Sequence, residues 1–227
     1  MNAHTTSEKI TAFDLDKPDL TFPMDREEFY NEQIAIFKKT GKSTKGISIV
    51  DVLLFDVNGE VFVQKRSGTK RHNPDLFDKS IGGHVASGDN PDFTVMVETV
   101  QELNVPSIVL RSEQDYLKCL RLLSGYLDTI ALIKNVSVFV APLQKIFDRE
   151  GVVITNKKYL YLGMYNGSTK TIDRESKGVL LYQLDDLIAE MTQFPERFTA
   201  DMHYYIEHHE KDLRKFIGDA VKVIATS

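Results

Sequence analysis

Cysteine and tryptophan are almost missing from this chain of 227 residues, which has one cysteine and no tryptophan. Cys119 cannot form a disulfide within the chain, so a reducing compartment is its simplest setting. No apolar run approaches the roughly 20 residues that a membrane-spanning helix needs. The first residues also lack the apolar segment of a secretory signal. We therefore expect a cytoplasmic protein that does not enter a membrane.

A surplus of basic residues is also missing, because 28 Lys and Arg stand against 33 Asp and Glu. The formal net charge is −5, whereas a protein that coats a nucleic acid polymer needs an excess of positive charge. This balance still allows a small basic pocket for phosphates. Apolar residues make up 42% of the chain, which is ordinary for a folded globular protein with one core.

Apolar periodicity and turn residues predict an α/β protein. Asn58-Gly59 between two apolar runs is a strong signal for a β-hairpin. Strands are expected over 47–55, 60–64, 76–81, 135–142, 157–165 and 179–183, and helices over 24–40, 91–103, 112–125, 184–191 and 199–217. These elements divide the chain into an N-terminal extension with one helix (1–45), an α/β domain (46–190) and a C-terminal helical segment (191–227).

The most informative segment is a glycine-rich loop followed by a helix. Asn90 is expected to cap this helix at its N-terminus, and Asn104 is expected to end it in a left-handed conformation. Glu98 and Glu102 are four residues apart, which places both carboxylates on one face of the helix. Carboxylate, amide and carbonyl oxygens are the ligands that Mg²⁺ prefers. In an arbitrary helix such a pair of glutamates is more often a solvated face, and the glycine-rich loop before this helix favours a metal site instead.

The segment 83–105 resembles the Nudix box, G-x5-E-x7-R-E-U-x-E-E-x-G-U, in which U is aliphatic. Gly83 stands at the first glycine, and Glu98 and Glu102 stand at two of the glutamates. The box is degenerate, because the chain has Asp89 for Glu, Val97 for Arg, Gln101 for Glu and Asn104 for Gly. The resemblance implies metal ligation by the side chains and backbone of Gly82, Gly83, Glu98, Gln101 and Glu102.

The stretch 61–85, VFVQKRSGTKRHNPDLFDKSIGGHV, is similar to the isopentenyl-diphosphate-isomerase-like branch of the Nudix superfamily. By this resemblance, Arg66 and Lys70 match positions that hold the substrate diphosphate. Glu175 matches a glutamate before the last strand and is the candidate for a further carboxylate that acts as a base or metal ligand. Isomerase activity is not expected, because Gly82 stands where the isomerases have their catalytic cysteine.

The resemblance as a whole implies a Nudix α/β/α sandwich with a mixed sheet, an N-terminal extension and a C-terminal helix. The first hypothesis is a hydrolase that uses Mg²⁺ or Mn²⁺ to cleave a diphosphate linkage in a small molecule, with Glu98, Glu102 and Glu175 as catalytic residues. The alternative is a weakly active or inactive protein of the same fold that binds a phosphorylated ligand, and the substitutions at Asp89, Val97 and Gln101 favour it.

A third reading is a scaffold that acts through its flanking helices. Residues 106–157 exceed the connection that this branch has between the box and the next strand. The sequence leaves open whether this insertion shapes specificity or forms a homodimer contact.

Overall fold

The computed structural model describes residues 8–169 and 176–227 of the chain. Ten strands in these residues form one sheet. They are β1 (Lys9–Asp14), β2 (Thr21–Asp25), β3 (Lys45–Phe55), β4 (Val61–Arg66), β5 (Phe77–Asp78), β6 (Ile81–His84), β7 (Ser107–Leu110), β8 (Ala131–Phe147), β9 (Glu150–Met164) and β10 (Ser176–Tyr182). The helices are α1 (Arg26–Thr40), α2 (Pro91–Leu103), α3 (Glu113–Leu123), α4 (Leu184–Gln193) and α5 (Ala200–Ala225), with short 3₁₀ turns at Ser124–Tyr126 and Pro195–Arg197.

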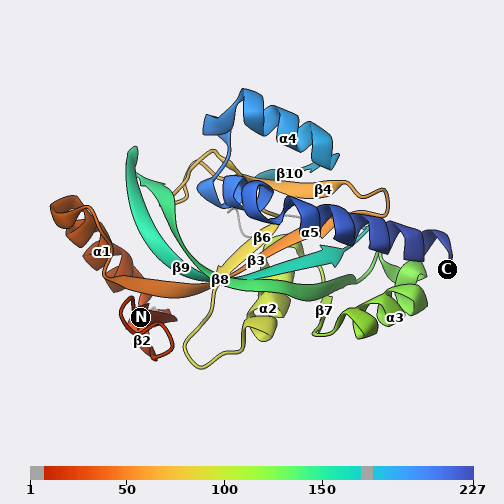
Figure 1. Cartoon of the computed structure of the whole chain (residues 1–227), viewed down its shortest axis with the longest axis horizontal. Coiled ribbons are helices and arrows are strands. Elements are labelled where there is room, and N and C mark those ends of the chain that lie inside the picture. Colours follow the sequence, from red (N-terminus) through yellow and green to blue (C-terminus); the bar gives the residue numbers. More distant parts are fainter. Residues whose placement is uncertain (1–7, 170–175) are drawn as a thin grey trace, which may run out of the picture.

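The sheet is mixed and strongly curled (Figure 1). Its main order is β10-β4-β3-β9-β8-β7, in which β3 runs parallel to β9 and β7 runs parallel to β8. The remaining pairs are antiparallel, including β3 with β6 and β4 with β10. The central strand β3 is buried on both faces, as its nearly continuous apolar sequence requires.

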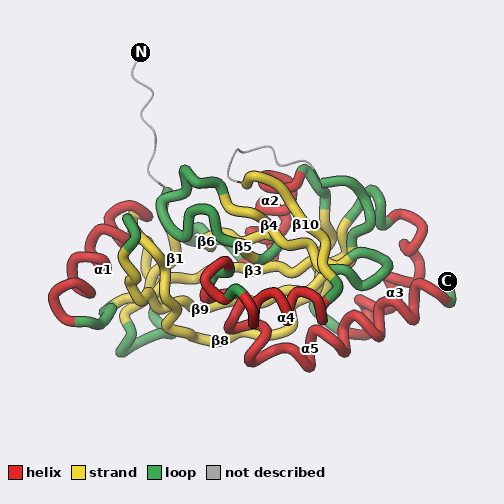
Figure 2. The backbone as a smooth tube through the Cα atoms, turned by 90° about the horizontal axis from the view of Figure 1, so that it is seen from above, coloured by secondary structure: helices red, strands yellow, loops and turns green. Residues whose placement is uncertain are grey.

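Helices cover both faces of this sheet (Figure 2). Leu53 and Phe55 of β3 belong to a core that includes residues of α5, whereas Val52 and Leu54 belong to a core that includes residues of α2. This alternation follows from the two-residue period of a strand. The predicted α/β class, with a mixed sheet between helices, an N-terminal extension and a C-terminal helix, is confirmed. None of the described helices is both long and apolar enough to span a bilayer.

The N-terminal extension joins the sheet. Its helix α1 has the predicted ends, since the Asp25 carboxylate accepts a hydrogen bond from the Glu28 amide at 2.8 Å and Gly41 adopts a φ of 72°. The sequence analysis did not predict strands β1 and β2. They pair with each other, and β1 also pairs with β3.

Residues 106–157, which the sequence analysis predicts to be an insertion, contain β7, α3, β8 and the first part of β9, and β8 and β9 form a long hairpin. The predicted strands at 135–142 and 157–165 are parts of this hairpin, which is much longer than expected. Its turn is Asp148-Arg149, and both residues have positive φ (48° and 72°). The hairpin curls beyond the other strands of the sheet, and its tip lies on the side of the molecule where α1 is found (Figure 1).

Candidate functional site

The glycine-rich loop and α2 form the local structure that the sequence predicted. The Asn90 side chain accepts a hydrogen bond from the Asp92 amide at 2.9 Å, and Pro91 begins the helix. Asn104 ends the helix with a φ of 58°, and its amide donates to carbonyls of the last turn. Asn tolerates this left-handed conformation better than most residues, so it replaces glycine here with little strain.

Gly83 forms a cradle for the carboxylate of Glu98. A Cβ atom on Gly83 would lie 2.0 Å from Glu98 Oε1 and 2.3 Å from its carboxyl carbon. No other residue type leaves this space, so the glycine lets the carboxylate lie directly against the backbone of β6. Glu102 follows one turn later on the same face of α2 and is only 6% exposed.

A cavity of about 620 Å³ opens beside this cradle. Seven of the eight predicted site residues line it: Arg66, Lys70, Gly82, Gly83, Glu98, Gln101 and Glu102. The eighth, Glu175, lies outside the described residues. Asp89 is exposed and is not among the lining residues. The loop–helix segment and the end of the β4 strand, which are far apart in sequence, therefore meet at one cavity.

The donors at the cavity fit partial ligation of a divalent cation. Among residues 8–169 and 176–227, no group of three or more His, Cys, Asp or Glu is arranged to hold a metal ion. The predicted set has only two carboxylates, with the Gln101 amide and backbone carbonyls beside them. Mg²⁺ is commonly held by one or two carboxylates together with waters and substrate phosphates. The cradle at Gly83 keeps the Glu98 carboxylate close to the backbone of β6, and both residues line the cavity.

Arg66 is more firmly engaged by the protein than the sequence suggested. It is 8% exposed, and its guanidinium donates to Asp78 Oδ2 at 3.0 Å and to the carbonyls of Asn73 (3.1 Å) and His72 (3.0 Å). These bonds fix the loop that follows β4. Lys70 lies on this loop, is half-buried and also lines the cavity.

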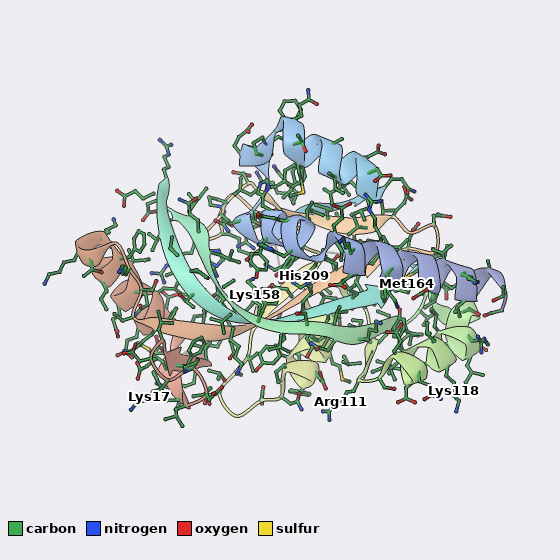
Figure 3. The ribbon with its side chains drawn as sticks, viewed as in Figure 1. Lys17, Arg111, Lys118, Lys158, Met164 and His209 are labelled. Atoms are coloured by element: carbon green, nitrogen blue, oxygen red, sulfur yellow. The ribbon has the colours of Figure 1, made fainter. Side chains whose placement is uncertain are left out.

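A buried network of charges forms the floor of the cavity. Lys79 forms ion pairs with Asp51 (3.0 Å), Asp78 (3.3 Å) and Asp201 (2.9 Å). Lys158 lies near the centre of the molecule (Figure 3) and contacts the same aspartates, Asp51 at 2.5 Å and Asp201 at 2.7 Å. The Tyr205 hydroxyl of α5 donates to Asp51 as well.

The charges in this floor balance, because the three aspartates face Lys79, Lys158 and Arg66. Burial opposes ionisation of Lys79, but the carboxylates of Asp201, Asp51 and Asp78 outweigh it and raise the pKa of Lys79 well above its usual value. Burial also opposes the charge of Asp201, yet the nearby lysines keep the pKa of this carboxyl well below its usual range. Lys79 and Asp201 are therefore held in their charged forms, and the formal charges of the three aspartates and the three cations sum to zero.

The sequence analysis missed this floor, although one signal for it was present. Asp51 is the single charged residue in the mostly apolar run 46–55, and such an exception in a strand buried on both faces indicates a paired charge. Its partners gave no comparable signal. Asp201 and Tyr205 lie in the C-terminal helix, about 150 residues further along the chain.

Comparisons with known proteins identify the fold only. No family model matches the sequence, and no curated protein matches it. The crystal structure of DR0079 from Deinococcus radiodurans is similar, with a TM-score of 0.51 and 16% identity over 71% of this chain and 81% of that chain. A MutT protein from Methanosarcina mazei Go1 gives a TM-score of 0.49 with 14% identity, over 73% of this chain and 94% of that one. The NUDIX domain of Shewanella oneidensis NrtR complexed with ADP ribose gives 0.47 with 16% identity, over 84% and 99%.

At these identities, the likeness to the Deinococcus structure shows a shared fold and carries no information about activity.

Proposed function

We propose that this chain is a Nudix-type hydrolase that cleaves a diphosphate linkage in a small molecule, such as a nucleoside diphosphate joined to another group. One observation carries the proposal. The acidic residues of the box-like helix and the basic residues after β4 line the same cavity, although they come from separate segments. This arrangement suits a diphosphate, because its oxygens need both a metal-binding side and a cationic side.

Each residue then has a defined task. Glu98, Glu102 and the Gln101 amide oxygen, with the carbonyls of Gly82 and Gly83, would hold Mg²⁺ or Mn²⁺. When bound, such a cation neutralises phosphate oxygens and makes water a better nucleophile.

Lys70 would supply a mobile positive charge to the diphosphate, and Arg66 would fix the loop that carries Lys70. Glu175 remains a proposed further carboxylate.

The experiment is a measurement of phosphate release from nucleoside diphosphates, dinucleotides and nucleotide sugars with Mg²⁺ or Mn²⁺. Turnover by the wild type should fall by about 100-fold or more in Glu102→Gln, as expected for a residue that takes part in the reaction. The matched control is Glu207→Gln on α5, whose carboxylate is exposed; its turnover should equal that of the wild type. Equal rates in both variants and the wild type would contradict the proposal.

A second candidate function is binding of a phosphorylated ligand without hydrolysis. Two observations favour it: Val97 and Gln101 stand where the box has charged residues, and the described residues contain no three-ligand acidic or histidine cluster. This protein would show a rise in melting temperature with nucleotides but no phosphate release with any substrate and either metal. Mn²⁺ binding that is lost in Glu102→Gln separates the two candidates, since the hydrolase requires it.

A further inference from the structure

The tip of the β8–β9 hairpin brings a lysine to the cavity that the proposed reaction does not use. Lys145 lines the cavity and is only 4% exposed. Its ammonium has three donors, and one of them binds the Tyr30 hydroxyl of α1 at 3.2 Å. Within the described parts of the chain, Lys145 forms no ion pair with a carboxylate. The charge of Asp201 acts on Lys145 at longer range. A buried ammonium that no carboxylate contacts directly still loses its hydration, so this position is suited to an anion.

The wall around Lys145 is built by contacts between distant segments. The Asn73 amide donates to the Ile146 carbonyl at 2.9 Å, and the Asn73 side-chain oxygen accepts from the Ile146 amide at 2.7 Å. These two bonds fix the loop after β4 against the residue next to Lys145. The His72 ring then lies 5.8 Å from the Tyr30 ring and 5.7 Å from the Phe147 ring, between centroids. We call Lys145, His72 and Tyr30 the hairpin wall.

The hydrogen bonds of the hairpin wall determine where its protons lie. Arg66 can only donate, so its contact of 3.3 Å with His72 Nδ1 leaves the proton of neutral His72 on Nε2. The Tyr30 hydroxyl accepts from Lys145 at 3.2 Å, and its own proton is free to be donated to His84 Nε2, which lies 2.8 Å away. The hairpin wall thus presents donors from Lys145 and His72, and no described carboxylate accepts from them.

The charge of the cavity supports an anionic ligand group here. Burial holds the pKa of His72 well below its usual value, and the charges of Lys145 and Arg66, which lie beside its ring, lower it further. Six cationic and five acidic side chains line the whole cavity, in a chain whose net charge is −5. The acidic groups Asp78 and Asp201 are already paired in the floor.

We infer that the hairpin wall binds a second anionic group of the ligand, a terminal phosphate or a carboxylate, in addition to the diphosphate. The inference rests on the proposed function for the position of the diphosphate. Lys145 would bind the second group through its charge, and His72 would donate from Nε2. Both residues lie outside the loop–helix segment that carries the acidic residues, so they would select the ligand rather than take part in the hydrolysis.

The test compares ligand pairs that differ by one anionic group, in the Glu102→Gln background so that the ligands stay intact. The pairs are NADPH against NADH for a phosphate, and UDP-glucuronate against UDP-glucose for a carboxylate. Calorimetry should give a dissociation constant at least about tenfold lower for the more anionic member of one pair, as expected for a hydrogen-bonded charge. The pair that shows this preference identifies the anion.

Replacing Lys145 by Met should remove this preference, and Lys145→Gln gives the same test if the methionine variant does not fold. The matched control is Lys134→Met, which changes another largely buried lysine of β8 that pairs with Glu113 away from the cavity; the preference should remain. Equal affinities within both pairs, or a preference that survives Lys145→Met and Lys145→Gln, would overturn the inference.

The melting temperature without ligand gives an independent readout. A buried ammonium that no carboxylate contacts directly carries a desolvation cost, which an apolar side chain of similar length avoids. Lys145→Met should therefore melt at or above the temperature of its parent, whereas a lysine with a purely structural role would lower it. Failure of the proposed function gives a different result from failure of this inference. The wild type with Mn²⁺ would then release no phosphate, while the ratio of affinities for the two members of each ligand pair would be unaffected.

Discussion

The cradle at Gly83 permits a sharp test, because the change Gly83→Ala acts on one carboxylate. The new Cβ would lie 2.0 Å from Glu98 Oε1, and ordinary contact begins at 3.4 Å, so the oxygen must move by about 1.4 Å. A misplacement of about 1 Å at a catalytic site can reduce the rate by about 100-fold, or about 2.7 kcal/mol. The stability should change little, within about 1 kcal/mol, since Glu98 is half-buried and can turn towards solvent.

The assay has three parts: Mn²⁺ affinity by calorimetry, turnover of the substrate found in the panel, and the melting temperature. Gly218→Ala on α5 is the control, because a Cβ there meets no atom within 4 Å. It should raise stability by up to about 1 kcal/mol and leave metal affinity and turnover unchanged. Wild-type metal affinity and turnover in Gly83→Ala would refute the role of the cradle. A large loss of stability in that variant would show instead that Gly83 is needed for packing.

Three further predictions concern stability. Lys158→Met should lower the free energy of unfolding, measured in urea, by about 3–5 kcal/mol, because the buried Asp51 and Asp201 would lose one of the two lysines that they share; Lys157→Met, the half-buried neighbour on the other face of β9, should change it by less than about 1 kcal/mol. Asn104→Ala should lower stability by about 1 kcal/mol while Asn104→Gly should not, since only the alanine is strained at a φ of 58°; equal melting temperatures would contradict this. The lowered pKa of His72 means that below about pH 6.5 the unfolded chain takes up a proton that the folded chain does not, so stability should fall as the pH decreases from 7 to 5. In His72→Gln this slope should be smaller by up to about 1.4 kcal/mol per pH unit, and identical slopes would show that His72 titrates normally.

Elements with local signals were predicted well. The ends of α1 and α2 depend on caps that lie within a few residues of each helix, namely Asp25, Gly41, Asn90 and Asn104, and all four adopt the expected conformations. The turn at Asn58-Gly59 is likewise local, with Phe55 paired to Val61. Beyond this pair, β3 forms hydrogen bonds with β6, and β4 forms hydrogen bonds with β10. No local sequence pattern could indicate this change of partner.

The elements that were missed depend on distant or unusual contacts. Strand β1 pairs with β3, more than 30 residues away, and its alternation is interrupted by polar residues. The β8–β9 hairpin turns at Asp148-Arg149, where two residues other than glycine have positive φ. The sequence there lacks the Asn-Gly or Asp-Gly signal that normally marks this turn, so the strands seemed shorter than they are.

The candidate site likewise has one part that local sequence predicts and another part that depends on the whole fold. The spacing of Glu98 and Glu102 on one helix brings them together whatever the rest of the fold does. Lys145 could not be placed by spacing, because its position in the cavity requires the full length of the hairpin and the bonds between Asn73 and Ile146. Its neighbours in the sequence, Gln144 and Ile146, give no indication of a buried charge.

The ion pairs of α5 with the sheet also bear on where the functional unit ends. Asp201 supplies a carboxylate to both Lys79 and Lys158, and Tyr205 donates to Asp51. A chain cut after residue 190 would keep all the residues that line the metal side of the cavity, yet it would leave two buried lysines with too little negative charge. Such a truncated protein should be destabilised because the charges in the floor of its cavity are no longer balanced. The shortest fragment that retains the site must therefore include the first turns of the C-terminal helix.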